Sequence, residues 1–166
     1  YTLFLPDFPK ALQYAEKAVE IARRIGNRPA EVRWRLHRGW TLRDMGRWQE
    51  AEREAEAILS LAEEESYDTI IPWIRLLRGQ LAGFRGDLAA AEGHIQEALE
   101  SARREVWWRL HFAGHAHAAL AWVRVEVGNW DGARREVQEA SVAAGRHSCR
   151  WCGDSVSLVA ATFEAL

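Results

Sequence analysis

The sequence has little lysine and cysteine, and it has no long apolar run. Only Lys10 and Lys17 are lysines among 22 basic residues, and the net charge at pH 7 is −2. This balance argues against a sequence-independent nucleic-acid partner, which a basic surface would bind. Two cysteines are too few for the disulfide framework of a small secreted domain. No apolar run approaches the roughly 20 residues of a membrane span. We therefore expect a soluble, cytoplasmic protein with no membrane partner.

The patterns that accompany common catalytic sites are also missing. No segment alternates polar and apolar residues over a convincing length, so we expect no β-sheet. The chain has no phosphate loop ending in Gly-Lys-Ser/Thr, no Ser/His/Asp order and no pair of catalytic carboxylates. We therefore expect a protein that is not an enzyme and needs no cofactor. Hydrophobic residues nevertheless make up 48% of the 166 residues, which is enough for one folded domain.

Four similar blocks divide the chain. Each block opens with a bulky residue that is followed three positions later by an alanine. The four openings are Phe8–Ala11, Trp48–Ala51, Leu88–Ala91 and Trp130–Ala133, spaced by 40, 40 and 42 positions. A glycine lies two residues before each of the last three openings, and small or aliphatic residues follow each alanine at i+4 and i+7. A constant period of this length is typical of stacked helical repeats.

Turn and cap residues predict where the helices begin and end. Asp7 is a plausible N-cap with Pro9 in the first turn, and Asp68 or Thr69 can cap a helix that ends at Arg85. The second helices of the repeats are expected over about 8–25, 48–65, 88–104 and 130–144. Outgoing helices, our name for the first helix of each pair, are expected over 29–45, from the cap at 68 or 69 to 85, and 107–127. A last helix is expected over 155–166.

Both ends of the sequence fall at nearly the same phase of the repeat. Residues 1–5 occupy the place of the last turn of an outgoing helix. We therefore expect residues 1–166 to form a single repeat array that is part of a longer one. The alternative is that a second copy covers the ends of the array and makes a homodimer, because such arrays usually need polar capping helices for solubility.

The second block resembles the tetratricopeptide repeat. It carries the glycine in the first helix, the aromatic-led turn and the alanines of the second helix at Gly39, Leu42, Gly46, Trp48, Ala51, Ala55 and Ile58. The later blocks match with more exceptions, so the resemblance covers nearly the whole chain. It implies an all-α, right-handed superhelical solenoid of antiparallel helix pairs with about seven full helices. The period exceeds the usual length of about 34 residues and is similar to the sensor arrays of large bacterial transcription regulators.

The resemblance implies that the outgoing helices line a concave groove. One stripe of each helix would face it at i, i+4, i+7 and i+11. These stripes are Arg33, His37, Trp40 and Asp44; Trp73, Leu77, Gln80 and Phe84; and His115, Ala119, Trp122 and Glu126. We expect a protein or peptide partner to bind there, with tryptophans as anchors and Arg33 as the partner of a carboxylate. Two alternatives are that the tryptophans fill the core between repeats, and that the groove senses a small ligand.

Two clusters could bind a metal, although neither is favoured. His147, Cys149 and Cys152 offer three zinc ligands, but a closed structural site needs a fourth. The same cysteine pair as a redox centre would need a βαβ context, which is absent. His111 and His115 share a helix face, yet no glutamate accompanies them as in a zinc protease. We favour a loop with two thiols and a pair of neighbouring histidines.

Overall fold

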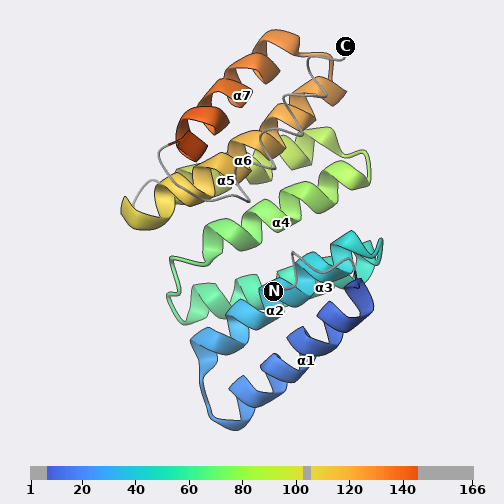
Figure 1. Ribbon diagram of the computed structural model, residues 1–166, viewed down its shortest axis with the longest axis vertical. Helices are drawn as coiled ribbons and strands as arrows, with labels where there is room; N and C mark the ends of the chain where they lie inside the picture. Colours follow the sequence, from blue (N-terminus) through green and yellow to red (C-terminus); the bar gives the residue numbers. More distant parts are fainter. Residues whose placement is uncertain (1–6, 103–105, 146–166) are drawn as a thin grey trace. The chain divides into compact units, whose positions relative to one another are not determined.

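The structure, a computed structural model, describes residues 7–102 and 106–145, and only the backbone of residues 106–111. These residues form seven helices and no strand (Figure 1). The helices are α1 (Phe8–Arg24), α2 (Arg28–Asp44), α3 (Trp48–Glu64), α4 (Ile71–Phe84), α5 (Leu88–Ala102), α6 (Val106–Glu126) and α7 (Trp130–Gly145). The predicted all-α fold is confirmed. The helix expected over 155–166 lies outside the described residues.

Tight turns end the helices where the sequence predicts breaks. Gly46 has φ of +73°, a left-handed conformation that L side chains disfavour. The backbone N–H of Arg47 reaches back to the carbonyl of Leu42, which satisfies an acceptor left over at the end of α2. Trp48 donates its indole N–H to the Arg43 carbonyl over 3.2 Å, so the aromatic that opens the block also closes the preceding helix. The other left-handed glycines are Gly26, Gly86 and Gly128.

Short polar side chains cap the starts of α1, α2, α5 and α7. Asp7 accepts the Lys10 backbone N–H over 3.0 Å, so the predicted cap of α1 is confirmed. The same bond, to the N–H three residues on, recurs at Asn27, Asp87 and Asn129. These caps satisfy donors that the first helical turn leaves unpaired.

The chain divides into two compact units, Tyr1–Leu81 and Ala82–Leu166, and the boundary falls inside α4. In the first unit α2 packs against α1 and against α3; in the second unit α6 packs against α5 and against α7 (Figure 1). Helices α2 and α6 therefore each touch the second helix on either side of them in sequence.

Small residues let these helices approach closely. The opening alanines of all four blocks are fully buried, which is what the repeat pattern predicts. A Cβ on Gly39 would lie only 2.8 Å from Leu77 Cδ2. The close neighbour of Gly39 therefore belongs to α4, the outgoing helix of the next repeat. The end of the Leu77 side chain fills this space, so a Cβ at Gly39 would require that side chain to move.

Buried carboxylates join neighbouring helices in both units. In the first unit Glu54 of α3, which is 6% exposed, accepts hydrogen bonds from Arg35 Nε over 2.7 Å and from Arg38. At the corresponding position of α7, 82 residues later, Glu136 lies 2.6 Å from His117 Nδ1 and 2.5 Å from Arg124 Nη1 of α6. A buried carboxylate is tolerated only when such partners replace its water, so these contacts fix the pairing of outgoing and second helices.

Glu31 makes a similar link at the start of α2. Its carboxylate accepts from Arg23 Nε of α1 over 2.8 Å and from Arg28 over 3.3 Å. Burial raises the pKa of Glu31, but the hydrogen bonds and positive charges of Arg23 and Arg28 outweigh it and leave the pKa below its ordinary value. The glutamate is therefore charged at neutral pH and holds the end of α1 to the start of α2.

Candidate interaction surface

The side chains predicted to line the groove fall into two groups, one in each compact unit. The first unit contains Arg33, His37, Trp40, Asp44, Trp73, Leu77 and Gln80. The second contains Phe84, His115, Ala119, Trp122 and Glu126.

Four aromatic rings form a continuous run in the first unit. Trp34 lies with its ring centroid 5.3 Å from that of His37, and His37 lies 5.3 Å from Trp40 in an edge-on arrangement. Trp40 then meets Trp73 of α4 edge-on at 5.7 Å. We call Trp34, His37, Trp40 and Trp73 the ring ladder. Edge-to-face contacts at these distances are favourable beyond the area they bury.

The ring ladder is buried at one end and open at the other. Trp40 and Trp73 are only 9% and 7% exposed, so most of their surface contributes to packing between α2 and α4. Trp34, at the outer end, is 38% exposed, and the neighbouring Arg33 is also exposed. The burial of Trp40 and Trp73 favours the core alternative for these two residues. The accessible part of this surface is Arg33 and Trp34.

Trp34 was missed by the sequence analysis. It lies about 100° around α2 from Arg33, off the stripe that helical spacing selects. The signal that could have found it is the spacing of aromatic rings at i, i+3 and i+6 through Trp34, His37 and Trp40, which places neighbouring rings in contact on one side of a helix.

His37 behaves as an aromatic side chain rather than as a charged one. Burial, aided by the positive charge of Arg33, lowers the pKa of His37 to about 4. Its Nδ1 atom is buried without a hydrogen-bond partner. At neutral pH the imidazole is therefore uncharged, and Arg33 carries the charge of this surface.

Arg43 of α2 holds both its neighbour Asp44 and Gln80 of α4. Arg43 donates from Nε to Asp44 Oδ1 over 2.8 Å and from Nη1 to Gln80 Oε1. This bridge links α2 to α4 near the end of the ring ladder. Gln80, which was predicted to face a partner, accepts a hydrogen bond that helps to align the two outgoing helices.

The second unit contains a smaller aromatic contact. The Trp122 ring of α6 lies 5.6 Å from that of Phe84, which is 45% exposed. Trp122 sits on Gly83, where a Cβ would come within 2.5 Å of Trp122 Cζ3. Of the other predicted residues in this unit, Glu126 is exposed, whereas His115 is buried. The accessible apolar contact is therefore Phe84 with part of Trp122.

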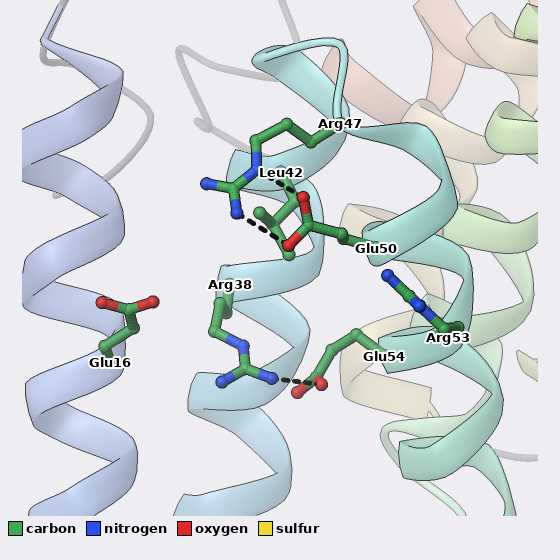
Figure 2. A pocket seen from close by; sticks show the side chains of 7 residues that line it. All are labelled: Glu16, Arg38, Leu42, Arg47, Glu50, Arg53 and Glu54. Carbon is green, nitrogen blue, oxygen red and sulfur yellow. Dashed lines mark hydrogen bonds and ion pairs between the residues drawn. The ribbon is translucent and has the colours of Figure 1, made fainter.

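A charged pocket of about 270 Å³ lies among α1, α2 and α3 (Figure 2). It is lined by Glu16, Arg38, Leu42, Arg47, Glu50, Arg53 and Glu54. Arg47 and Glu50 form a two-pronged ion pair at its upper edge, with both N–O distances 2.7 Å. The hydrogen bond with Arg47, reinforced by the charges of Arg53 and Arg38, lowers the pKa of Glu50. Three arginines and three glutamates balance one another, so the pocket has no net charge to select an ion.

No pattern in the sequence indicates this pocket. Its charged residues come from three helices, and only the Arg47–Glu50 spacing of three residues is a local signal. Arg38 and Glu54 are 16 positions apart and meet only because α2 and α3 pack together. The charges reach one pocket through tertiary packing rather than through a motif.

Within the described residues, no group of three or more His, Cys, Asp or Glu side chains could hold a metal ion. The candidate ligands His147, Cys149 and Cys152 lie outside those residues, as does the side chain of His111, so these hypotheses stay predictions. None of the helices in the described ranges is both long and apolar enough to cross a membrane.

Comparison with known proteins agrees with this architecture. The sequence pattern of the tetratricopeptide repeat matches residues 5–64. Among solved structures, the chain is similar to BtubC (BKLC) from P. vanneervenii, with a TM-score of 0.67 and 18% identity. The match covers 87% of this chain and 59% of that one, so this chain spans less than two thirds of its length. No curated protein sequence matches.

The predicted resemblance to the tetratricopeptide repeat is thus confirmed for residues 5–64, and the structural likeness shows a helical-repeat fold over most of the chain. Tetratricopeptide repeats generally mediate protein–protein interaction or act as scaffolds, and the fold is typically non-catalytic.

Proposed function

We propose that this chain is a non-catalytic interaction or scaffold module that binds a peptide or partner domain along its outgoing helices. The observation that carries the proposal is the open end of the ring ladder. Trp34 is an exposed tryptophan held against His37, beside the exposed Arg33. Tryptophan and arginine are the residues that most often dominate binding energy at protein interfaces.

The chemistry of this surface indicates the kind of peptide it would accept. The Trp34 ring offers an apolar face that is already ordered by the ring ladder, so binding costs little side-chain entropy there. Arg33 can hold a carboxylate through two parallel hydrogen bonds. We therefore propose a peptide with an apolar side chain next to an acidic group. Trp40 and Trp73 support this surface from beneath and do not need to touch the partner.

We also propose that this array belongs to a cytoplasmic bacterial regulator. Its support is the repeat period of about forty residues, which is similar to that of sensor arrays in such regulators. The single array over residues 1–166 is likewise proposed from the repeat pattern.

Affinity capture from a cell lysate, read by mass spectrometry, tests the interaction surface. Bait proteins would be the unchanged chain, Trp34→Ala and Arg33→Glu. The matched control is Trp130→Ala, which removes a tryptophan of similar exposure, 45%, from the second unit. We expect one protein to be lost from both first-unit variants and kept by the control.

Circular dichroism would verify that all four baits are equally helical. A protein captured equally by every bait would exclude the open end of the ring ladder as the binding surface. Capture of no protein at all would instead favour the small-ligand alternative.

A further inference from the structure

Glu16 and Arg53 lie on opposite sides of the charged pocket in the first unit. Glu16 comes from α1 and Arg53 from α3, and Figure 2 shows the side chains of α2 between them. The other four charged side chains pair with one another, Arg47 with Glu50 and Arg38 with Glu54. Within the part of the chain that the structure describes, neither Glu16 nor Arg53 makes a hydrogen bond or an ion pair. One carboxylate and one guanidinium are therefore open to a ligand.

The charges of Glu16 and Arg53 both act on the pocket. The hydrogen bond with Glu50 is the main cause that raises the pKa of Arg47, and the negative charge of Glu16 adds to it. The hydrogen bond with Arg47 likewise lowers the pKa of Glu50, and the positive charge of Arg53 adds to that effect. Both open charges are therefore close to the ion pair at the edge of the pocket.

The repeat pattern does not require these charges. Glu54 recurs at the same repeat position of the second unit as Glu136, where it again joins a second helix to the preceding outgoing helix. In the second unit the residues at the positions of Glu16, Arg47 and Glu50 are Gln96, Asn129 and Gly132. Helices α5, α6 and α7 pack without those charges. Packing therefore explains Glu54, whereas the remaining charges of the pocket call for a ligand.

The size and the lining of the pocket limit the ligand. Its volume of about 270 Å³ lies below the roughly 300–1,000 Å³ of sites for drug-sized molecules. Leu42 is the one apolar residue that the described part of the chain contributes to the lining. A guanidinium binds a carboxylate, and a carboxylate accepts from an ammonium group. A small molecule with both groups satisfies both sides of the pocket, whereas a simple anion or cation leaves one side without a partner.

We propose that the charged pocket binds a small zwitterion of the size of a free amino acid or a dipeptide. Its ammonium group meets Glu16 of α1, and its carboxylate meets Arg53 of α3. The ligand thereby joins two helices that lie on either side of α2. This site is separate from the open end of the ring ladder, because it uses none of its residues. Either site can fail its test without affecting the other.

Thermal unfolding of the unchanged chain with the common amino acids and glycine-containing dipeptides tests the ligand class. We expect at least one of these zwitterions to raise the unfolding midpoint, because a ligand that binds only the folded state stabilises it. Two derivatives of the best zwitterion then separate its charges. The N-acetylated form lacks the ammonium group, and the C-terminal amide lacks the carboxylate. Calorimetry should find that each derivative binds about tenfold more weakly, since each loses a hydrogen bond between charged groups.

Variants test the two residues. Glu16→Gln and Arg53→Gln should each weaken binding of the zwitterion about tenfold. Both side chains are exposed, so circular dichroism should show unchanged helicity. Glu16→Gln should also bind the zwitterion and its N-acetylated form equally, because the ammonium group then has no charged partner. The matched control is Arg135→Gln, which removes an exposed arginine at the repeat position of Arg53 in the second unit; it should leave the affinity unchanged.

Three results would overturn the proposal. The first is that no amino acid or dipeptide changes the unfolding midpoint. The second is equal affinity of the unchanged chain for the zwitterion and its N-acetylated form, which would mean that Glu16 does not hold an ammonium group. The third is a loss of affinity in Arg135→Gln as large as that in Arg53→Gln, which would show that the ligand binds arginine side chains without selecting this pocket.

Discussion

His37, which lies among tryptophan rings, is uncharged at neutral pH. His37 touches the rings of Trp34 and Trp40, and its pKa lies near 4 because burial disfavours the imidazolium. In the unfolded chain a histidine titrates near pH 6.5. Below that pH the unfolded state binds a proton that the folded state does not, so stability is complete above pH 6.5 and is lost as the pH falls toward 4.

We expect His37 to make the first unit sensitive to mild acid. When the pH falls from 7.5 to 5.0, the free energy of unfolding should decrease by about 2 kcal/mol, because His37 binds a proton in the unfolded chain but not in the folded one. Urea unfolding at both pH values would measure the loss for the unchanged chain and for His37→Phe, in which the ring remains but the titration does not. The loss should be smaller in the variant by roughly that amount. Equal losses would show that His37 is protonated in the folded state.

Gly83 and Gly93 form a matched pair of glycines within helices. An alanine Cβ at Gly83 would meet the rigid Trp122 ring at 2.5 Å, whereas at Gly93 it would meet nothing within 4 Å. Overpacking lowers the free energy of unfolding by about 1–3 kcal/mol, whereas exchange of glycine for alanine within a helix raises it by about 1 kcal/mol. Gly83→Ala should therefore lower the urea midpoint and Gly93→Ala should raise it. A rise in both would mean that the indole moves aside at little cost.

The stripes of the outgoing helices were predictable from spacing, but their exposure was not. The i, i+4, i+7 rule placed His37 and Trp40 on one side of α2 correctly. It could not tell that Trp40 would be 9% exposed and Trp34, off the stripe, 38%. Burial depends on which neighbour covers each part of the helix, and Trp73 covers Trp40 from α4. The charged pocket lined by Arg38 was unpredictable for the same reason, because its residues meet only when α1, α2 and α3 pack together.

At the scale of the elements, helix boundaries were the most predictable feature because local chemistry sets them. Asp7 begins α1 and Gly46 ends α2 through bonds to their own backbone neighbours. The connection from α3 to α4 is the exception. Ser66 adopts φ of +56°, whereas four other described turns have a left-handed glycine at this place, and the Tyr67 N–H still reaches the Ala62 carbonyl over 2.8 Å. This turn therefore has the same left-handed conformation as the glycine turns, although serine disfavours it.

Ser66→Gly should therefore stabilise the protein. A left-handed conformation costs a non-glycine residue about 1–2 kcal/mol, and part of this gain is lost to the greater freedom of glycine in the unfolded chain. We expect the free energy of unfolding to rise by about 1 kcal/mol in Ser66→Gly and to fall by a similar amount in Gly46→Ala, where no neighbour obstructs a Cβ. Thermal unfolding followed by circular dichroism would measure both. No change in either variant would contradict strain at these turns.

Across the whole molecule, the same repeat position carries a buried carboxylate in each compact unit. Glu54 and Glu136 both accept two cationic or imidazole partners from the preceding outgoing helix. Neither was selected by the sequence analysis, because a glutamate in a second helix looks like any solvated charge. Their partners lie 12 to 19 residues away in sequence and meet them only after the helices pair.

These two carboxylates can show whether the chain unfolds as a repeat protein. In helical repeats each helix is stabilised mainly by its neighbours, so a local loss stays local. Glu54→Gln leaves Arg35 and Arg38 without their charge partner, at a cost of about 3 kcal/mol. Hydrogen exchange read by mass spectrometry should then show faster exchange in α2 and α3 than in α6 and α7, and Glu136→Gln should show the reverse. Equal acceleration in all helices by either variant would mean that both units unfold together.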